Sequence, residues 1–204
     1  MQTKTGLTIG VLVLGAIAPA QAQTQAAGGV MAPFVGVGLT FGGENLATAQ
    51  YTNGTSQSIT TGGLLDLRFG LEYRLIGQPW AIQGVVAYHV DTVNATNGDL
   101  RFERVPVELI AMYDLGSQWR VGLGMRKATG AKVTASGDAA GAGFGSSTTF
   151  DSNLGFLAVA EYKVTPQVGL QLRYVNESYK VKFPTTQPTV DGSHAGIFGV
   201  FYFK

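Results

Sequence analysis

The sequence predicts an all-β chain that folds into an eight-stranded antiparallel up-and-down transmembrane β-barrel, and three observations predict this fold class. Apolar and polar residues alternate in eight segments of about ten residues, the period expected of β-strands. Charged residues make up only 13% of the 204 residues and apolar residues 45%, whereas charged residues make up about 25% of ordinary soluble domains. The connections between the segments are alternately short and long, as in membrane barrels.

The N-terminus has the features of a signal peptide. A short basic start precedes an apolar run from Gly6 to Ala18, and small residues suited to cleavage follow up to Ala22. The alternative, a membrane-spanning helix, needs about 18 or more apolar residues, and this run is shorter. We therefore predict a signal peptide at residues 1–22, an N-terminal tail at 23–27 and a barrel domain at 28–204. The chain has no cysteine, which excludes disulfides and thiolate sites.

The alternation is clearest in LLDLRFGLEYRL, residues 64–75. Successive side chains of a strand point to opposite faces, so one face here is apolar and the other carries four charges. Those charges are Asp66, Arg68, Glu72 and Arg74. If the apolar face meets lipid, a one-residue slip would place both arginines in hydrocarbon at about 2–4 kcal/mol each near the midplane. Lipid itself would then fix the register.

Seven further segments complete the predicted set. In chain order they are 33–41, 80–90, 104–113, 119–126, 153–164, 168–177 and 194–203. Pro106 lies inside one of them and cannot donate a ladder hydrogen bond, so we expect a local bulge there. The segment 153–164 is apolar on both faces except for Glu161 and Lys163, which makes its orientation the hardest to assign.

The connections sort by length. The short ones are 76–79, 114–118 and 165–167, and the long polar ones are roughly 42–60, 91–100, 128–150 and 178–192. Because consecutive antiparallel strands alternate in direction, the three short turns fall at one end and the four long loops at the other. Short periplasmic turns and longer external loops are typical of outer-membrane barrels.

Aromatic residues flank the short turns on the apolar face. They are Tyr73, Trp80, Tyr113, Trp119 and Tyr162. Tyrosine and tryptophan favour membrane interfaces, so these positions predict a girdle on the periplasmic side. The alternatives are a soluble sandwich in which these are core residues, or a soluble barrel of the lipocalin kind with its two faces reversed.

These residues resemble the small eight-stranded outer-membrane barrels, the family that includes the OmpA transmembrane domain, OmpX, OmpW and the opacity-type proteins. The resemblance covers residues 28–204 and is carried by the loop sorting, by strands such as FGLEYRL and LQLRYV, and by the aromatic C-terminal strand. It implies an exported protein in the outer membrane of a Gram-negative bacterium. It also implies that Phe201 and Phe203 form the signal for the barrel-assembly machinery, although Lys204 stands where the family has a final phenylalanine.

The predicted inward face carries a nearly balanced set of charges. Its members are Asp66, Arg68, Glu72, Arg74, Arg104, Glu108, Arg120, Arg126, Glu161, Arg173 and Glu177. Eight strands enclose an interior just wide enough for side chains to fill. We therefore expect a side-chain-filled, charged lumen and a structural or surface-interaction role. One alternative is a narrow ion path through the same network, and another is a channel for small apolar molecules, whose apolar lumen only the segment 153–164 would provide.

An enzymatic role is the remaining alternative, since some barrels of this size modify lipid A with a histidine, a serine and an acid. His89 precedes Asp91 on one predicted face, and His194 follows Ser193. A serine next to a histidine can act as a nucleophile, but the His-x-Ser arrangement of the lipid A deacylases is absent. We expect no enzymatic activity, no cofactor and no metal site, and we interpret His89 as a hydrogen-bonding residue of the lumen.

The expected partners follow from the same features. Outer-membrane lipid surrounds the apolar face, the barrel-assembly machinery acts during biogenesis, and the external loops offer a surface for a ligand that the sequence does not identify. The formal charge of +1 lacks the basic footprint of nucleic-acid binding. We expect a monomer.

Overall fold

The computed structural model describes residues 28–50, 56–95, 98–137, 147–182 and 189–203. Eight strands form the barrel: β1 (Gly29–Gly42), β4 (Leu64–Leu75), β5 (Trp80–Ala95), β6 (Gly98–Asp114), β7 (Trp119–Ala135), β9 (Leu154–Lys163), β10 (Val168–Asn176) and β13 (His194–Tyr202). The part of the chain so described contains no helix long and apolar enough to cross a membrane. The predicted signal peptide, the N-terminal tail and Lys204 lie outside these residues.

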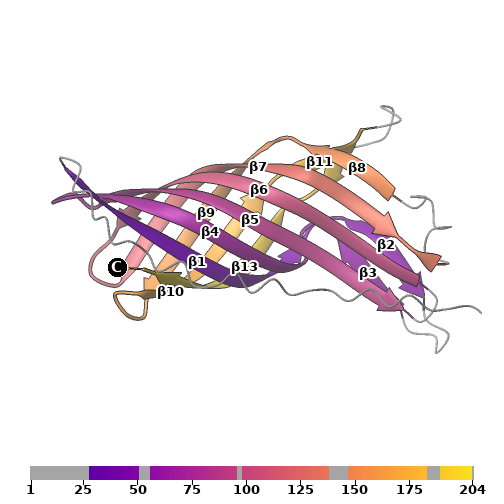
Figure 1. Cartoon of the computed structure of the whole chain (residues 1–204), viewed down its shortest axis with the longest axis horizontal. Helices are drawn as coiled ribbons and strands as arrows, with labels where there is room; N and C mark the ends of the chain where they lie inside the picture. Colours follow the sequence, from indigo (N-terminus) through magenta and orange to yellow (C-terminus); the bar gives the residue numbers. More distant parts are fainter. Residues whose placement is uncertain (1–27, 51–55, 96–97, 138–146, 183–188, 204) are drawn as a thin grey trace, which may run out of the picture.

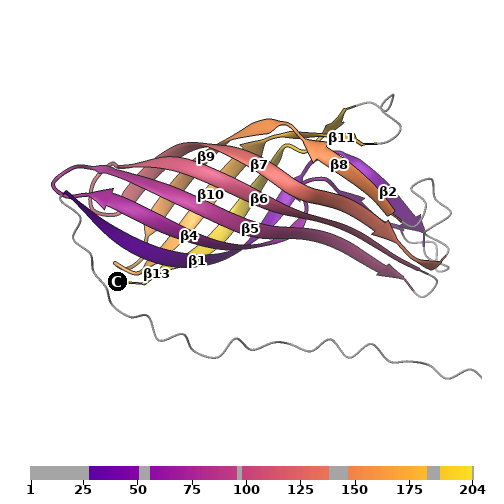
Figure 2. The same ribbon diagram turned by 45° about the horizontal axis from the view of Figure 1, so that its top comes forward.

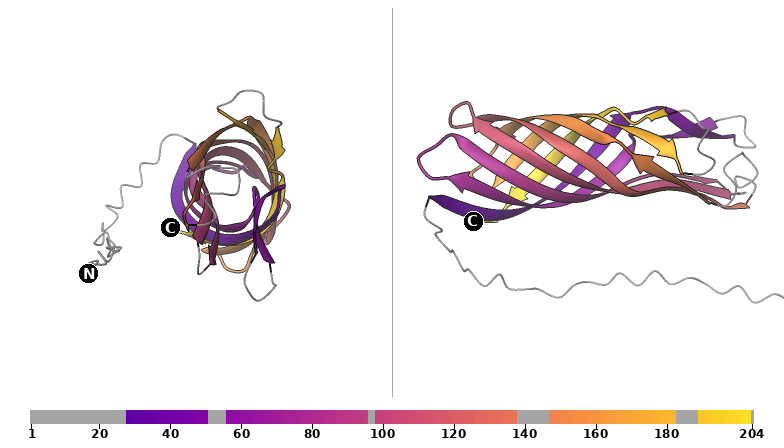
Figure 3. Two further views of the ribbon diagram at one scale, coloured as in Figure 1. Left: turned by 90° about the vertical axis from the view of Figure 1, so that its right-hand side faces the viewer. Right: turned by 90° about the horizontal axis from the view of Figure 1, so that it is seen from above.

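The barrel strands pair in a closed antiparallel ring. Each strand pairs with its nearest barrel neighbours along the chain, in the order β1, β4, β5, β6, β7, β9, β10, β13. The pairing of β13 with β1 closes the ring, which Figure 3 shows end-on. The predicted eight-stranded up-and-down barrel is therefore confirmed.

The two faces of each strand have opposite polarity in the middle of the barrel. Phe69 on β4 is 69% exposed, whereas the neighbouring Arg68 is 1% exposed and Asp66 is fully buried. The same contrast recurs around the ring, with Leu123 of β7 72% exposed beside the buried Arg126. An outward apolar band and an inward polar face are what a lipid-embedded barrel requires.

This polarity reverses toward the end of the barrel that carries the long connections. On β6 the outward face changes from Val105 to the partly exposed Glu103 and the exposed Arg101, while the inward face changes from the buried Arg104 to the buried Phe102. The reversal has a direct physical cause, because outside the bilayer the outward face meets water and the inward face packs a core. The level of Glu103 therefore marks the outer limit of the apolar band on β6.

The two ends of the barrel differ, and Figures 1 and 2 place the short turns at the left and the long hairpins at the right. The described parts of the long connections were predicted as loops, but they consist largely of strands. They are the outer parts of β5, β6 and β7, together with β2 (Asn45–Gln50), β3 (Ser56–Thr60), β8 (Ser147–Ser152), β11 (Ser178–Val181) and β12 (Val190–Asp191). β8 and β11 continue the sheet beyond β7, while β2 and β3 form a separate hairpin.

An apolar core lies inside the barrel at the end that carries the long connections. Phe102 packs edge-on against Phe150 of β8 and Tyr179 of β11, with ring centroids 5.8 and 5.6 Å apart. Ile59 of β3 is fully buried in the same cluster, so the β2–β3 hairpin contributes to it. The hairpin is held by the Asp91 carboxylate, whose Oδ2 accepts a hydrogen bond from the Thr60 backbone N–H at 2.8 Å.

The bulge expected at Pro106 lies beside it. The pairing register of β6 with β7 shifts between Glu103 and Val105. Gly130, with φ of +62°, lies on the facing part of β7, where its left-handed conformation accommodates the extra residue. The bulged strand is therefore β7 rather than the strand that contains the proline.

Candidate functional site in the barrel interior

The charged residues predicted to face the lumen lie in the interior of the barrel. Ten of the eleven are buried, and the Arg74 side chain is 33% exposed at the short-turn end. They divide into two groups. The short-turn cluster comprises Glu72, Arg74, Arg120 and Glu161 with Asp114 and Lys163, and the central cluster comprises Asp66, Arg68, Arg104, Glu108, Arg126, Arg173 and Glu177.

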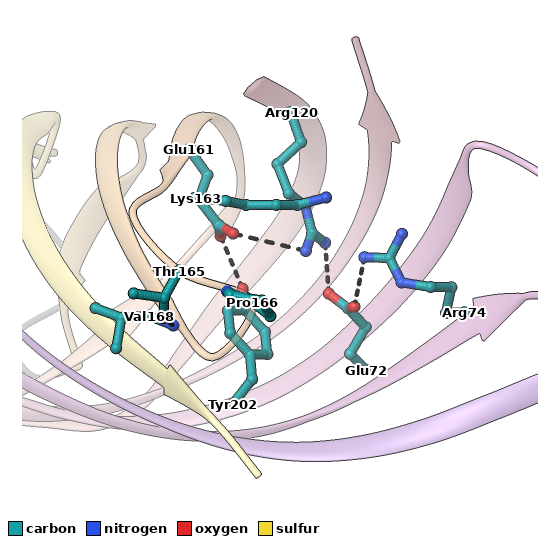
Figure 4. Close-up of a pocket in the computed structure, with 9 residues that line it drawn as sticks. All are labelled: Glu72, Arg74, Arg120, Glu161, Lys163, Thr165, Pro166, Val168 and Tyr202. Carbon is teal, nitrogen blue, oxygen red and sulfur yellow. Dashed lines mark hydrogen bonds and ion pairs between the residues drawn. The ribbon is translucent and has the colours of Figure 1, made fainter. Parts of the chain in front are cut away.

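In the short-turn cluster, carboxylates and cations alternate around the lumen. Arg74 contacts Glu72 at 2.9 Å and Asp114 at 2.5 Å, and the Lys163 ammonium lies 3.0 Å from Asp114. Arg120 donates a short hydrogen bond to Glu72 from the other side. Figure 4 shows five of the six side chains, all but Asp114, converging from different strands. Six ionised groups, three positive and three negative, therefore form a network of ion pairs at the short-turn end.

Asp114 and Lys163 were not among the residues predicted to face the lumen, although Lys163 was noted as one of two charged residues in its segment. Both stand at strand ends beside predicted turns, but each has the inward parity of its strand, Asp114 that of Glu108 and Lys163 that of Glu161. Asp114 lies beyond the aromatic girdle, outside the apolar band. Burial alone would raise the pKa of its carboxyl, but the hydrogen bond from Lys163 and the charge of Arg74 outweigh burial and hold that pKa below its usual range.

Glu108 is the hub of the central cluster. Its carboxylate lies 2.5 Å from Arg173, 3.0 Å from Arg126 and 3.6 Å from Arg68. Arg126 also contacts Glu177 at 3.0 Å, so the ion pairs join β4, β6, β7 and β10 across the lumen. Buried charges of this kind are tolerated only when each is paired.

Arg104 differs from the other charged residues of the central cluster. Within the described ranges, no carboxylate oxygen lies within 4.0 Å of its guanidinium. Its Nη2 lies 3.1 Å from the His89 imidazole, and the guanidinium stacks on Phe102 with 4.7 Å to the ring centroid. The aromatic face supplies part of the stabilisation that a carboxylate would otherwise give.

The two histidines are buried beside the central cluster, with ring centroids 5.1 Å apart. His89 Nε2 lies 2.7 Å from the Thr40 hydroxyl, so His89 occupies a hydrogen-bonded position in the lumen. The structure does not assemble the pairs considered for catalysis. Asp91 binds the β2–β3 hairpin, Ser193 accepts a hydrogen bond from Asn176 at 3.2 Å, and His194 Nδ1 lies 2.7 Å from the Gly192 carbonyl.

The interior also contains a group of buried apolar residues, here called the apolar layer, although the Gln171 side chain joins the two charged clusters by hydrogen bonds with Glu161 and Arg173. The buried residues of this layer are Phe34, Ala81, Val85, Ile110, Met112, Leu157, Val159, Val175, Phe198, Val200 and Tyr202. They come from six of the eight strands, so the expectation that only 153–164 contributes apolar lumen residues was wrong. In segments such as ELIAMY, the residues of both faces are apolar, so the sequence pattern does not show which of them point inward.

Inward glycines seat the largest side chains of this layer. A Cβ at Gly70 of β4 would overlap the ring of Phe34, and a Cβ at Gly122 of β7 would overlap Met112. Phe198 likewise lies against Gly38. The strands β4 and β7, which carry Gly70 and Gly122, are the two that contribute no apolar side chain to the layer. Large and small residues at facing positions fill the interiors of small barrels in this way.

The predicted aromatic girdle lies on the outward face at the short-turn end. Trp80 and Tyr113 form a cross-strand pair with centroids 4.7 Å apart, and Trp119 and Tyr162 form another at 5.1 Å. The Tyr73 ring lies over Gly29. Outward aromatics at one level mark a bilayer interface.

The C-terminal phenylalanines also point outward. Phe201 is 39% and Phe203 is 44% exposed. Their rings lie 5.1 Å apart in an edge-on arrangement. Two exposed aromatic rings at the end of the last strand therefore form a small apolar surface beside the short turns.

A closed barrel with an outward apolar band, an aromatic rim and a polar interior is an integral outer-membrane β-barrel protein. The chain belongs to the family described as Opacity family porin protein, whose sequence profile matches residues 86–198. Barrels of this class have short periplasmic turns and longer external loops, so we expect the short-turn end to face the periplasm and the long hairpins to be external.

Two solved outer-membrane proteins are similar in structure. Ail of Yersinia pestis, in complex with the heparin analogue sucrose octasulfate, is 12% identical with a TM-score of 0.48, covering 86% of this chain and 97% of that one. Neisserial surface protein A is 19% identical with a TM-score of 0.45, covering 84% and 94%. No protein with a curated description matches the chain.

Proposed function

We propose that this protein is a structural or surface-interaction barrel whose lumen does not conduct. The filled interior carries the proposal, because buried ion pairs and large apolar side chains seated on glycines occupy the lumen. An ion crossing this interior would lose its hydration and would have to displace paired charges and packed side chains, which is costly in a low-dielectric interior.

The external half supports a role at the cell surface. The strands extend past the apolar band and enclose their own core around Phe102, Phe150 and Tyr179. A packed core holds the described outer strands in fixed positions, so these strands present a preformed surface.

The remaining assignments complete the proposal. The protein acts as a monomer in outer-membrane lipid after export by a cleaved signal peptide. It has no cofactor and no enzymatic activity. The exposed rings of Phe201 and Phe203 are the signal for the barrel-assembly machinery, for which a small apolar surface at the end of the last strand is a suitable recognition element.

A channel is the second candidate, favoured by the word porin in the description of the family. Conductance separates the two functions. Purified barrel in a planar bilayer should show no discrete openings, and Phe198→Ala, which removes the ring seated on Gly38, should introduce small ones. Leu123→Ala on the outward face is the matched control and should show no openings. Openings of the wild-type protein that vanish on joint neutralisation of Arg68 and Glu108 would establish the channel instead.

A further inference from the structure

The exposed cations on the outside of the barrel lie on one side of the molecule. Outside the lumen, the described ranges contain five lysine and arginine residues, and all five lie past the apolar band at the end that carries the long connections. They are Arg101 on β6, Lys127 and Lys132 on β7, Lys180 on β11 and Lys182 directly after it. Because β6, β7, β8 and β11 are neighbours in one sheet, as Figure 1 shows, these residues share one surface, which we call the basic face.

Glu103 lies between the cations of β6 and β7 and is already engaged. Its Oε2 lies 3.0 Å from the Arg101 guanidinium and accepts a hydrogen bond from the Tyr88 hydroxyl at 2.7 Å. Lys132 lies directly opposite Glu103 in the strand pairing, but within the described ranges no carboxylate oxygen lies within 4.0 Å of its ammonium. The charge of Lys132 is therefore not neutralised by a neighbouring side chain of those ranges.

The cations beside β8 repeat this arrangement. Asp151 on β8 lies directly opposite Lys180, but its carboxylate contacts the Lys182 ammonium at 3.2 Å. Among the residues that the structure describes, none places a carboxylate oxygen within 4.0 Å of the Lys180 ammonium. Lys127 lies nearby, because its ammonium donates a hydrogen bond to the Ser152 carbonyl at 2.7 Å.

The charge at this end of the barrel is distributed unevenly. The basic face carries five cations and three carboxylates, those of Asp99, Glu103 and Asp151, so two positive charges are in excess. The rest of the exterior at this end has the opposite sign, because its exposed charged residues within the described ranges are Glu44, before β2, and Asp191 on β12. The barrel therefore has a positive and a negative side beyond the apolar band.

The basic face begins where the apolar band ends and points sideways, into the plane of the membrane. On β7 the outward Met125, which is 44% exposed, is followed at the next outward position by Lys127. Lys180 lies close to the same level, because its neighbour Tyr179 pairs with Ser152, whose carbonyl binds Lys127. Long basic side chains at such positions place their charged ends among lipid headgroups.

We propose that the basic face binds the phosphate groups of anionic lipids in the surrounding leaflet, so that these lipids gather along β7, β8 and β11 and not on the opposite side. Lysine binds phosphate as a point charge, and clusters of lysine and arginine at a membrane surface attract anionic lipids. Lys127 and Lys180 contact the phosphates, and the three cations farther out add to the positive potential, which extends about 8 Å at physiological salt. The face is separate from the lumen, so its lipid contacts are independent of conductance.

A lipid titration of the wild-type barrel in nanodiscs tests the proposal. The discs contain phosphatidylcholine and a fraction of phosphatidylglycerol that is raised from zero, and NMR follows backbone amides on two sides of the barrel. The amides of Lys127 and Lys180 should shift in a saturable way, whereas those of Phe41 and Leu64, exposed at the outer ends of β1 and β4, should shift little. Equal shifts on the two sides, or no shift on the basic face, would overturn the proposal.

A soluble polyanion is the competing occupant of this surface, and tripolyphosphate serves as its probe. Added to the barrel in discs of phosphatidylcholine alone, at physiological salt, it should give only weak, non-saturating shifts of the Lys127 and Lys180 amides. Saturable shifts with tripolyphosphate, together with no response to phosphatidylglycerol, would assign the face to a soluble ligand and overturn the lipid assignment.

A single variant tests the contribution of one cation. Lys180→Gln breaks no ion pair among the described residues, and the phosphatidylglycerol fraction that gives half of the Lys127 shift should rise about fivefold, the factor for one cation at a charged membrane surface. Lys163→Gln, which removes a lysine at the short-turn end, is the matched control and should leave that fraction unchanged. An unchanged fraction in folded Lys180→Gln, or an equal rise in the control, would exclude the proposed contact. Should a variant not fold, the comparison of the two sides in the wild type decides the question.

Discussion

Removing the Glu108 carboxylate should destabilise the barrel more than any other single neutralisation in the central cluster. This carboxylate contacts Arg173, Arg126 and Arg68 at 2.5, 3.0 and 3.6 Å. In Glu108→Gln, Arg126 keeps Glu177 and Arg68 keeps Asp66, but Arg173 loses its carboxylate partner. Breaking a buried ion pair from one side costs ~3–5 kcal/mol, because it leaves an uncompensated charge. We expect a loss in that range.

The assay is urea unfolding in phospholipid vesicles, followed by tryptophan fluorescence and by the heat-modifiable mobility of the folded band. Glu103→Gln is the matched control, because its partly exposed pair with Arg101 should contribute only ~0–1 kcal/mol. The double variant Glu108→Gln/Arg173→Met also removes the unpaired Arg173 charge and should recover part of the lost stability. A Glu108→Gln barrel as stable as the Glu103→Gln control would refute the role of the Glu108 carboxylate as the shared partner of three arginines.

Three further predictions use the same unfolding assay. Gly38→Ala forces a Cβ into the ring of Phe198 and should cost ~1–3 kcal/mol, while Gly199→Ala, which meets open space on the same sheet, should be nearly neutral; equal effects would argue against the packed layer. Leu123→Arg places a cation on the lipid face and should cost up to ~2–4 kcal/mol, and no loss would mean that this position meets water. Asp114 has a folded-state pKa below its unfolded value, so its contribution is present above the unfolded pKa and is lost as the pH falls through the folded one. Asp114→Asn should therefore narrow the stability difference between neutral pH and about pH 3, and an unchanged difference would contradict the pairing with Lys163.

The strands within the apolar band could be predicted because lipid imposes one rule on all of them. Every outward position there must be apolar, so the alternation in residues 64–75 fixes both the strand and its register. The same rule gives the wrong prediction beyond the apolar band, at the end that carries the long connections. There Val93 and Phe102 point inward and Arg101 points outward, so the pattern reverses, and the polar composition of these segments suggested loops.

The interior could be predicted only where one side of a strand is charged. Arg68 and Glu108 were evident from parity, but Ile110 and Met112 were not, because their neighbours on both sides are also apolar. Which charges meet across the lumen depends on how eight strands close around it, and sequence carries no direct signal of that. Arg104 shows the limit, since it stacks on Phe102 instead of joining a carboxylate.

Cysteine accessibility on β5 tests most directly that the apolar face meets lipid and that the lumen is filled. The chain has no native cysteine, so single substitutions can be placed outward at Ile82 and Val86, inward at Ala81 and Ala87, and externally at Lys182 as a positive control. In the folded barrel in vesicles, a hydrophilic thiol reagent should modify only the Lys182→Cys variant. A lipid-soluble maleimide should reach the outward pair as well, and the inward pair should react only after unfolding. Modification of the inward pair by the hydrophilic reagent in the folded barrel would mean a water-filled lumen and would contradict the plugged interior.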